Sequence, residues 1–276
     1  MGKGLGRFRI VNYIWHRTYK FMYYHYGLNK VKIDGIIYYL DPKDFISLNL
    51  LVNKVYEPTQ TKLVKRIIKP GNVVVDIGAN IGYYTLLFAK LVGPQGKVYA
   101  FEPDINNFKL LSKNIKANPY NNIILENKAV SDVTGKIKLY LSKDGTGAHK
   151  IHNKKNDREF IYVDSIALDD YFRSKKINID FIKMDIEGAE VKALKGMKKL
   201  ISSNTNLKLI SEFNPTDILD IGDSPETYLE SLYHLFGEVY NIDENSEEII
   251  KYDMKKFIRK IKDGSLTPTN LLCIKK

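Results

Sequence analysis

The chain has 276 residues, of which 44% are hydrophobic and 27% charged, and its formal net charge is +11 at pH 7. These proportions are ordinary for a globular protein and exclude a low-complexity chain, while a single cysteine, Cys273, excludes an internal disulfide. No stretch offers the roughly 20 apolar residues of a membrane-spanning helix, and we expect no signal peptide.

The positive charge is unevenly placed along the chain. Residues 1–33 contain seven basic residues and no acidic one, so they hold seven of the eleven net charges. Within this region, residues 7–28 predict an amphipathic helix with an aromatic face and a basic face. Such a helix can lie on an anionic membrane surface, pack on the rest of the chain, or bind nucleic acid or a protein partner. The sequence leaves these roles open.

The next segment, residues 31–68, predicts small elements ahead of the main fold. Asp34-Gly35 lies between two apolar runs at 31–40 and predicts a β-hairpin with a two-residue turn. Residues 42–56 predict a short helix or a loop. Pro58 suits an early position in a helix expected over 57–68, because the N–H group that proline lacks has no partner there.

From residue 72 onward, strand and helix patterns alternate. We expect strands at 72–76, 96–101, 122–126, 178–184, 206–213, 237–242 and 269–275, and helices at 81–92, 104–118, 188–202, 225–236 and 248–261. Alternating residues at 135–142 and 160–164 predict an added β-ribbon within an insertion at about 135–164. The pattern as a whole predicts an α/β, Rossmann-like fold with a mostly parallel sheet and helices on both faces. Such folds bind ligands at the carboxyl ends of the strands.

The first of these strands leads into a glycine-containing loop with the spacing Asp76-x-Gly78-x-Asn80-x-Gly82. This loop and the helix that follows it, from about Tyr83, predict N–H groups and the positive end of a helix dipole around one pocket. The spacing is not the G-x-G-x-x-G of dinucleotide sites, because Asn80 stands at the second glycine position. The loop therefore suits a carboxylate better than a pyrophosphate, which disfavours a nicotinamide oxidoreductase.

Glu102 follows the second strand, twenty residues after Gly82. Doubly wound folds place at this point an acid that binds both ribose hydroxyls. A ribose-binding acid beside a loop without the pyrophosphate pattern suggests a nucleoside with a charged tail. S-adenosylmethionine fits that description.

Taken in order, the motifs resemble those of class I S-adenosylmethionine-dependent methyltransferases and, more narrowly, those of the FkbM family. They cover roughly residues 56–215: Lys69-Pro70-Gly71-Asn72, VVVDIGANIGYYTL at 73–86, AFEPD at 100–104, Ala129-Val130-Ser131-Asp132, residues 163–170, FIKMDIEGAEVKALKG at 181–196 and Ser211-Glu212-Phe213-Asn214-Pro215. The resemblance implies a seven-stranded sheet with the last strand antiparallel. It also implies a methyltransferase domain at 56–276, with residues 1–55 as an N-terminal extension.

The methyl donor is a sulfonium with an electrophilic methyl carbon, so the protein mainly has to orient it. We expect the loop to hold the amino-acid end, Glu102 to hold the ribose, and the end of the third strand to contact the adenine, as the family pattern also implies. The residues expected to bind the donor are Asp76, Gly78, Asn80, Gly82, Tyr83, Glu102, Pro103, Ala129, Val130 and Asp185.

Three carboxylates are expected to converge on one rim of the pocket. Asp185 and Glu187 follow the strand at 178–184, and Glu212 ends the strand at 206–213. They suit a divalent cation such as Mg²⁺, which would lower the pKa of an acceptor hydroxyl, or one of them suits the role of general base. Glu187 could equally have the structural role of stabilising the N-terminus of the helix expected at 188–202, where the helix dipole favours an acidic side chain. His149, in the ribbon, is a further candidate base or a surface residue.

The turn after the fourth strand reads Asp185-Ile186-Glu187-Gly188 rather than the Asn/Asp-Pro-Pro-aromatic run of methyltransferases that act on exocyclic amines. This favours a hydroxyl acceptor, and the resemblance implies hydroxyls of sugars, polyketides and other secondary metabolites. We therefore expect a cytoplasmic O-methyltransferase acting on a sugar, glycoconjugate or secondary metabolite, with peripheral membrane contact through residues 7–28. The alternatives are an RNA methyltransferase, disfavoured by the small net charge outside residues 1–33, and a non-catalytic S-adenosylmethionine-binding module.

Overall fold

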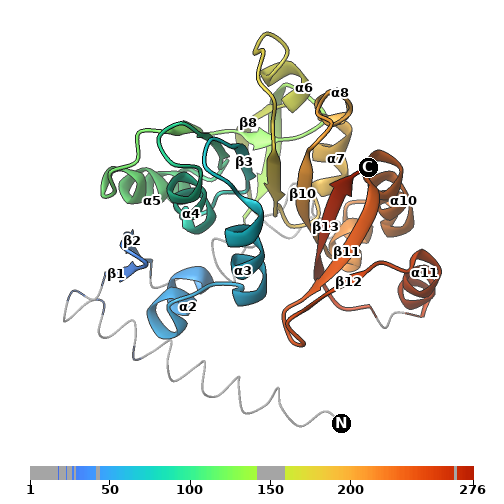
Figure 1. Ribbon diagram of the computed structural model, residues 1–276, viewed down its shortest axis with the longest axis horizontal. Helices are drawn as coiled ribbons and strands as arrows, with labels where there is room; N and C mark the ends of the chain where they lie inside the picture. The colour runs from blue at the N-terminus through green and yellow to red at the C-terminus, as the bar shows by residue number, and fades with distance from the viewer. Residues whose placement is uncertain are drawn as a thin grey trace.

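The computed structural model describes residues 29–41, 44–141, 159–263 and 266–276, together with Thr18, Tyr23 and Gly27. At its centre is an eight-stranded sheet in the order β12-β11-β13-β10-β9-β3-β4-β5 (Figure 1). Its strands are β3 (Val73–Ile77), β4 (Lys97–Phe101), β5 (Ile123–Glu126), β9 (Phe181–Met184), β10 (Lys208–Phe213), β11 (Gly237–Asp243), β12 (Glu248–Lys251) and β13 (Thr269–Lys275). Strands β10, β9, β3, β4 and β5 are parallel, and β13 is antiparallel to both of its neighbours.

Helices cover both faces of the sheet (Figure 1). One face packs against α3 (Pro58–Ile67) and α4 (Tyr83–Val92), and the other against α6 (Leu168–Tyr171), α7 (Glu190–Lys195), α8 (Lys198–Ser203) and α10 (Pro225–Phe236). Val74 packs in the apolar core on the first of these faces and Val75 in the apolar core on the second, and both side chains are fully buried. Successive side chains of a strand point to opposite faces, which is why this run of valines suits a strand covered on both sides.

Four further helices complete the part of the chain that the structure describes: α2 (Phe45–Asn53), α5 (Ile105–Lys116), α9 (Pro215–Asp220) and α11 (Met254–Lys262). Helix α2 is the short helix that residues 42–56 allowed, and its N-cap is Asp44. Helix α5 packs Leu111 against Ala79 and Ala100, beside the loop that follows β3.

The expected hairpin consists of β1 (Lys30–Ile33) and β2 (Ile36–Tyr39). Two asparagines, Asn114 on α5 and Asn118 just after the end of this helix, bind the free edge of β2. The side chain of Asn118 accepts from Ile37 N and donates to Ile37 O, at 2.9 and 2.8 Å. Asn114 does the same with Tyr39, at 2.6 and 3.2 Å. These amides take the place of a neighbouring strand, because backbone polar groups need partners where they are buried.

The predicted β-ribbon is present in a separate three-stranded sheet, with the order β6-β8-β7. Its strands are β6 (Ala129–Val130), β7 (Gly135–Tyr140) and β8 (Phe160–Ile166). β7 and β8 pair antiparallel, as expected for a ribbon, and β8 also pairs parallel with β6. The insertion is therefore joined directly to two of the residues expected at the adenine.

The prediction of a helix at 248–261 is wrong in its first half. Glu248–Lys251 form β12, which pairs antiparallel with β11, and only α11 is helical. The β-branched Ile249 and Ile250 suit a strand, and pairing with the edge of β11 outweighs the helical spacing of the segment. The main sheet therefore has eight strands, one more than the resemblance implies.

The helix expected at 188–202 is divided into α7 and α8 around Gly196. A Cβ at this position would lie 2.0 Å from the carbonyl oxygen of Ser131. The carbonyl of Gly196 also accepts from Asp169 N at 2.9 Å. The close backbone approach explains why a glycine stands here, and it interrupts what the sequence presents as one helix.

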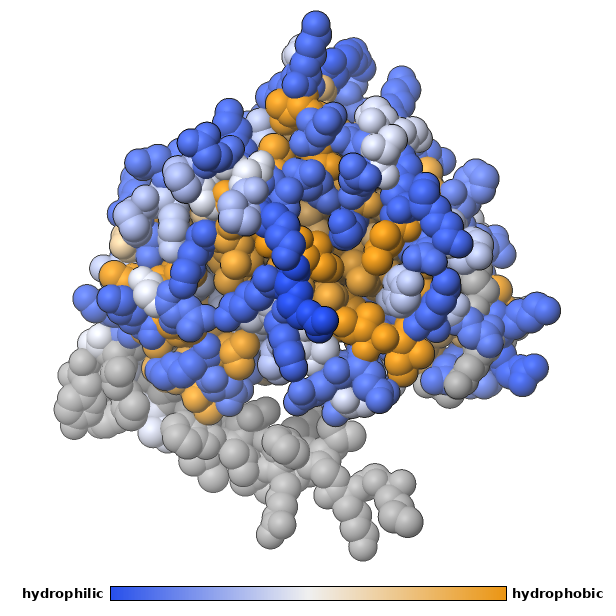
Figure 2. Space-filling model, in the orientation of Figure 1, coloured by the Kyte–Doolittle hydropathy of each residue, from blue (hydrophilic) through white to orange (hydrophobic). Residues whose placement is uncertain are grey.

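The face shown in Figure 2 is covered mainly by hydrophilic side chains, with hydrophobic residues grouped toward its middle. Among the described residues, no helix is long and apolar enough to cross a membrane. The amphipathic helix predicted at 7–28 lies outside the described residues except for Thr18, Tyr23 and Gly27, so it stays a prediction.

Candidate active site

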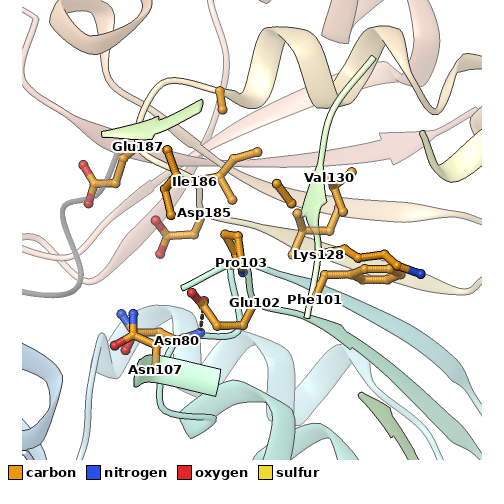
Figure 3. A pocket seen from close by; sticks show the side chains of 15 residues that line it. Asn80, Phe101, Glu102, Pro103, Asn107, Lys128, Val130, Asp185, Ile186 and Glu187 are labelled. Atoms are coloured by element: carbon orange, nitrogen blue, oxygen red, sulfur yellow. Dashed lines mark hydrogen bonds between the residues drawn. The ribbon is translucent and has the colours of Figure 1, made fainter. Parts of the chain in front are cut away.

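Two adjoining cavities lie at the carboxyl ends of β3, β4 and β9. The first has a volume of about 570 Å³ and faces β6 (Figure 3), and the second has a volume of about 860 Å³ and reaches α2 and α4. The residues that line both cavities are Gly78, Asn80, Asp185 and Glu187. The cavities therefore meet where the loop after β3 faces the turn after β9.

The loop after β3 is closed by its own hydrogen bonds. Gly78 N and Ala79 N both donate to Phe101 O at 3.0 Å, and Gly82 N donates to Ala79 O at 2.8 Å. We expected these N–H groups to bind a carboxylate, but they join the loop to itself and to β4. A helix leaves its first N–H groups without intrahelical partners, so those at the start of α4, from Tyr83 onward, suit a ligand carboxylate better.

Gly78 has a packing role that its motif does not reveal. Its φ is +81°, and a Cβ there would lie 2.0 Å from the carbonyl oxygen of Asp185. The glycine thus lets the ends of β3 and β9 approach each other closely, in a backbone conformation that other residues rarely adopt. That approach brings Asp185 to the junction of the two cavities.

Glu102 is held rigidly at the floor of the first cavity (Figure 3). Its side chain is 5% exposed, and its two oxygens accept from Asn80 N at 2.8 Å and from Asp104 N at 2.9 Å. Burial raises its pKa to about 7. A carboxylate accepts more than two hydrogen bonds, so Glu102 can still accept from a ligand in the cavity.

The far wall of the first cavity is mainly apolar. Asn127 holds the chain there by donating to Glu102 O and Pro103 O, at 2.8 and 3.1 Å. Two polar residues that we did not predict, Asn107 and Lys128, complete the wall. The expected residues on it are Pro103, Ala129 and Val130, and Phe101 lines it as well. A wall of this kind suits a flat heterocycle.

Asp76 lies on the second cavity and is 1% exposed. Its Oδ2 accepts from Thr85 Oγ1 at 2.6 Å, which joins the end of β3 to the first turn of α4. Burial raises its pKa to about 6, against the opposing effect of Lys183. Asp76 is therefore part of a buried group of charges.

Lys183 is the centre of that group, and sequence reasoning missed it. Its side chain is 3% exposed, and its Nζ lies 2.9 Å from Asp185 Oδ2 and 4.6 Å from the centroid of the Tyr84 ring. Burial lowers its pKa, but Asp185, Glu57 and Asp76 outweigh burial and raise the pKa above its usual value. A lysine inside a strand covered on both faces is itself a signal, because buried lysines require partners.

The three rim carboxylates are close together, as expected. Oxygen atoms of Asp185, Glu187 and Glu212 lie within 4.8 Å of one another. Burial raises the pKa of Glu212 well above its usual range, and Asp185 adds to the effect. Among the described residues, Oε2 of Glu212 is buried and has no hydrogen-bond partner. Such a group can take up a proton or a cation.

Glu190 is 1% exposed and accepts from Ile186 N at 2.9 Å, so it fixes the turn after β9. Burial raises its pKa to about 7. His149 lies outside the described residues, and its proposed role stays a prediction.

The mostly parallel sheet with β13 reversed between β10 and β11, the loop after β3 and the acid after β4 define a Rossmann-like methyltransferase fold. The methyltransferase FkbM domain matches residues 76–245 of the chain. The chain therefore belongs to the FkbM methyltransferase family.

Relatives of the chain are known methyltransferases. It is 30% identical over 158 residues to the 2-O-methyltransferase NoeI of Sinorhizobium fredii, covering 51% of this chain and 63% of that protein. It is 28% identical over 134 residues to the hexuronic acid methyltransferase AglP of Haloferax volcanii, covering 48% and 52%. The crystal structure of a SAM-dependent O-methyltransferase from Thermotoga maritima is similar with a TM-score of 0.45 and 13% identity, covering 89% of this chain and 77% of that one. The chain thus matches less than two thirds of the length of NoeI and of AglP.

Proposed function

We propose that this protein transfers a methyl group from S-adenosylmethionine to a hydroxyl oxygen of a sugar or glycoconjugate. Membership of the FkbM family supports methyl transfer, and the printed names of NoeI and AglP support a sugar acceptor. One observation carries the proposal: the buried carboxylate of Glu102 lies at the floor of the first cavity, where two backbone N–H groups hold it in place.

The residues of the site fit the donor. Two ribose hydroxyls would give Glu102 hydrogen bonds that its environment leaves unmade, and this would offset the burial that raises its pKa. The apolar wall with Ala129 and Val130 would hold the adenine, and the start of α4 would hold the carboxylate. Asp76 suits the ammonium of the amino-acid end.

When bound, S-adenosylmethionine supplies an electrophilic methyl carbon on a sulfonium. The protein then has to orient the acceptor oxygen and to accept its proton. Asp185 suits the second task, because it lies at the junction of both cavities and is 25% exposed in its side chain. Lys183 holds one of its oxygens and leaves the other for the hydroxyl. Glu187 and Glu212 are the alternative bases.

A divalent cation on Asp185, Glu187 and Glu212 is the second way to lower the pKa of the hydroxyl. The two options differ in one observable. With a carboxylate base, methyl transfer continues in EDTA. With a cation, transfer stops in EDTA and returns when Mg²⁺ is added in excess.

The proposal is tested by calorimetry and by transfer of labelled methyl from S-adenosylmethionine to fractionated glycolipids and sugars, each with and without EDTA. Glu102→Ala is expected to abolish donor binding, because the ribose loses its acceptor. Glu230→Ala, an exposed residue of α10, is the matched control and leaves binding unchanged. Unchanged donor affinity in Glu102→Ala would contradict the role of Glu102 at the ribose. Label that enters RNA instead of sugar would contradict the proposed sugar acceptor.

The location of the protein is part of the same proposal. Residues 7–28 would bring a cytoplasmic enzyme to the membrane surface that carries lipid-linked acceptors. Removal of residues 1–28 should then reduce sedimentation with anionic liposomes and leave donor binding intact. Equal sedimentation of both forms contradicts membrane contact.

A further inference from the structure

Asn114 joins three segments that lie far apart in the chain. It belongs to α5 and is fully buried. Its Oδ1 accepts from Tyr39 N at 2.6 Å, and its Nδ2 donates to Tyr39 O at 3.2 Å and to Ile81 O at 2.8 Å. Tyr39 is in the hairpin and Ile81 is in the loop after β3. One buried amide therefore connects the hairpin to the loop beside both cavities.

The hairpin fixes the orientation of this amide. In the opposite orientation, Oδ1 of Asn114 would face the carbonyl oxygens of Tyr39 and Ile81, and no acceptor would face Tyr39 N. An amide oxygen accepts and an amide nitrogen donates, so only the observed orientation satisfies all three contacts. The hairpin precedes residues 76–245, the part of the chain that matches the FkbM domain, yet it helps to hold a loop inside that domain.

The peptide group between Ile81 and Gly82 is held at both of its polar atoms. Asn114 binds the carbonyl oxygen, and Gly82 N donates to Ala79 O at 2.8 Å. Because a peptide group is planar, these two bonds set its orientation. Loss of the first bond would leave a buried carbonyl oxygen unpaired and free the peptide to rotate.

Parts of the proposed methyl-donor site lie on both sides of this peptide group. Asn80 precedes it, lines both cavities and donates its N–H to Glu102 at 2.8 Å (Figure 3). Tyr83 follows it as the first residue of α4, whose start suits the carboxylate of the methyl donor. Rotation of the peptide would displace these two parts relative to each other.

Asn118 makes a similar contact with the hairpin and does not reach the loop. Its side chain is half-buried and pairs with both polar backbone atoms of Ile37. Its Nδ2 also donates to Asn114 O at 2.8 Å, in the preceding turn. The two asparagines thus share the contact with β2, and they differ in the third bond, which only Asn114 makes to Ile81 O.

We propose that Asn114 is a positioning residue for the methyl donor. By holding Ile81 O it sets the orientation of the loop after β3, and through Tyr39 it makes the hairpin part of the donor site. This inference rests on the proposed function and deepens it, because it adds a residue and an N-terminal segment to the site that binds S-adenosylmethionine.

Calorimetry with S-adenosylmethionine on the full chain tests the residue. We expect Asn114→Ala to lower the affinity about tenfold, because a buried hydrogen bond to the loop is lost, and Asn118→Ala to lower it less than about twofold. Circular dichroism confirms that each variant is folded, so a loss of stability alone does not change the affinity measured. Asn114→Ser leaves a hydroxyl at the buried site and is the milder second variant. It should lower the affinity at least about threefold.

Hydrogen exchange followed by mass spectrometry adds a readout that a purely structural role would not change. Coupling between two sites is reciprocal, so saturating S-adenosylmethionine should slow exchange in residues 36–40 of the unaltered protein, by about threefold or more. Asn118→Ala should keep this protection, and Asn114→Ala or Asn114→Ser should lose it. The measurement on the unaltered protein decides the matter if neither Asn114 variant folds.

The outcomes separate the two proposals. Absence of S-adenosylmethionine binding to the unaltered protein overturns the proposed function together with the inference. If the methyl donor binds, unchanged affinity in the Asn114 variants overturns the inference alone. An equal loss of affinity in Asn118→Ala also overturns it, and so does exchange in residues 36–40 that the methyl donor does not alter.

Discussion

Replacement of Lys183 by Met tests whether the buried charges balance one another as the structure indicates. Met keeps the length of the side chain and removes its charge. Asp185, Asp76 and Glu57 would then share a buried site without a cation. Removal of one partner of a buried pair costs about 3–5 kcal/mol of folding free energy, and we expect this loss at pH 8.

The loss should depend on pH in a defined direction. Burial holds the pKa of Asp76 at about 6 and that of Glu57 at about 7, and Lys183 lowers both values. These folded-state values exceed those of the unfolded chain, so the folded state binds more protons and loses stability as the pH rises through them. Each proton contributes about 1.4 kcal/mol per pH unit. Without Lys183 the pKa of each acid rises further, so the deficit is smallest near pH 5 and largest above pH 8.

Urea denaturation followed by circular dichroism between pH 5 and pH 9 measures this deficit. Lys195→Met is the control, because Lys195 pairs with Asp223 at 3.3 Å but is 49% exposed in its side chain. It should cost less than about 1 kcal/mol at every pH. A deficit for Lys183→Met that is flat across the pH range would refute the assignment of Lys183 as the balancing charge.

Two further predictions concern the donor loop and its acid. Gly78→Ala should cost more than Gly35→Ala in urea denaturation: both have positive φ, worth about 1–2 kcal/mol, but only a Cβ at 78 meets another atom within 4 Å. Equal costs would show that the contact with Asp185 does not limit this position. Donor affinity in calorimetry should fall about tenfold between pH 8 and pH 6, because Glu102 has a pKa of about 7 and can accept from both ribose hydroxyls, beside its two backbone donors, only when ionised. A flat pH profile would contradict that role.

Local signals in the chain predicted most of the fold. The run Val73–Ile77 and the glycines after it indicated a buried strand and a tight loop, because only short-range chemistry is involved. The hairpin turn at Asp34-Gly35 was equally local. Residues 248–251 were predicted wrongly because they pair with β11, a partner that local spacing does not reveal.

The site was predicted in part for the same reason. Residues that end strands, such as Glu102 and Asp185, could be placed at one edge of the sheet, since parallel strands end together. Lys183 within a buried strand indicated that it has partners but not which ones, and the position of Asp44 before a helix gave no indication of the cavity. They reach the cavity only through the packing of distant segments.

The sequence by itself determined most of the alternation of strands and helices, the tight glycine loop after β3 and the family to which the motifs belong, because each depends on neighbours in the chain. The tertiary structure decided that the loop amides bind β4, that Lys183 stands among three acids, and that α2 closes the second cavity. Those features arise from contacts between segments far apart in the chain. The free energy of such contacts depends on burial and on interatomic distances, which are set only when the segments pack together.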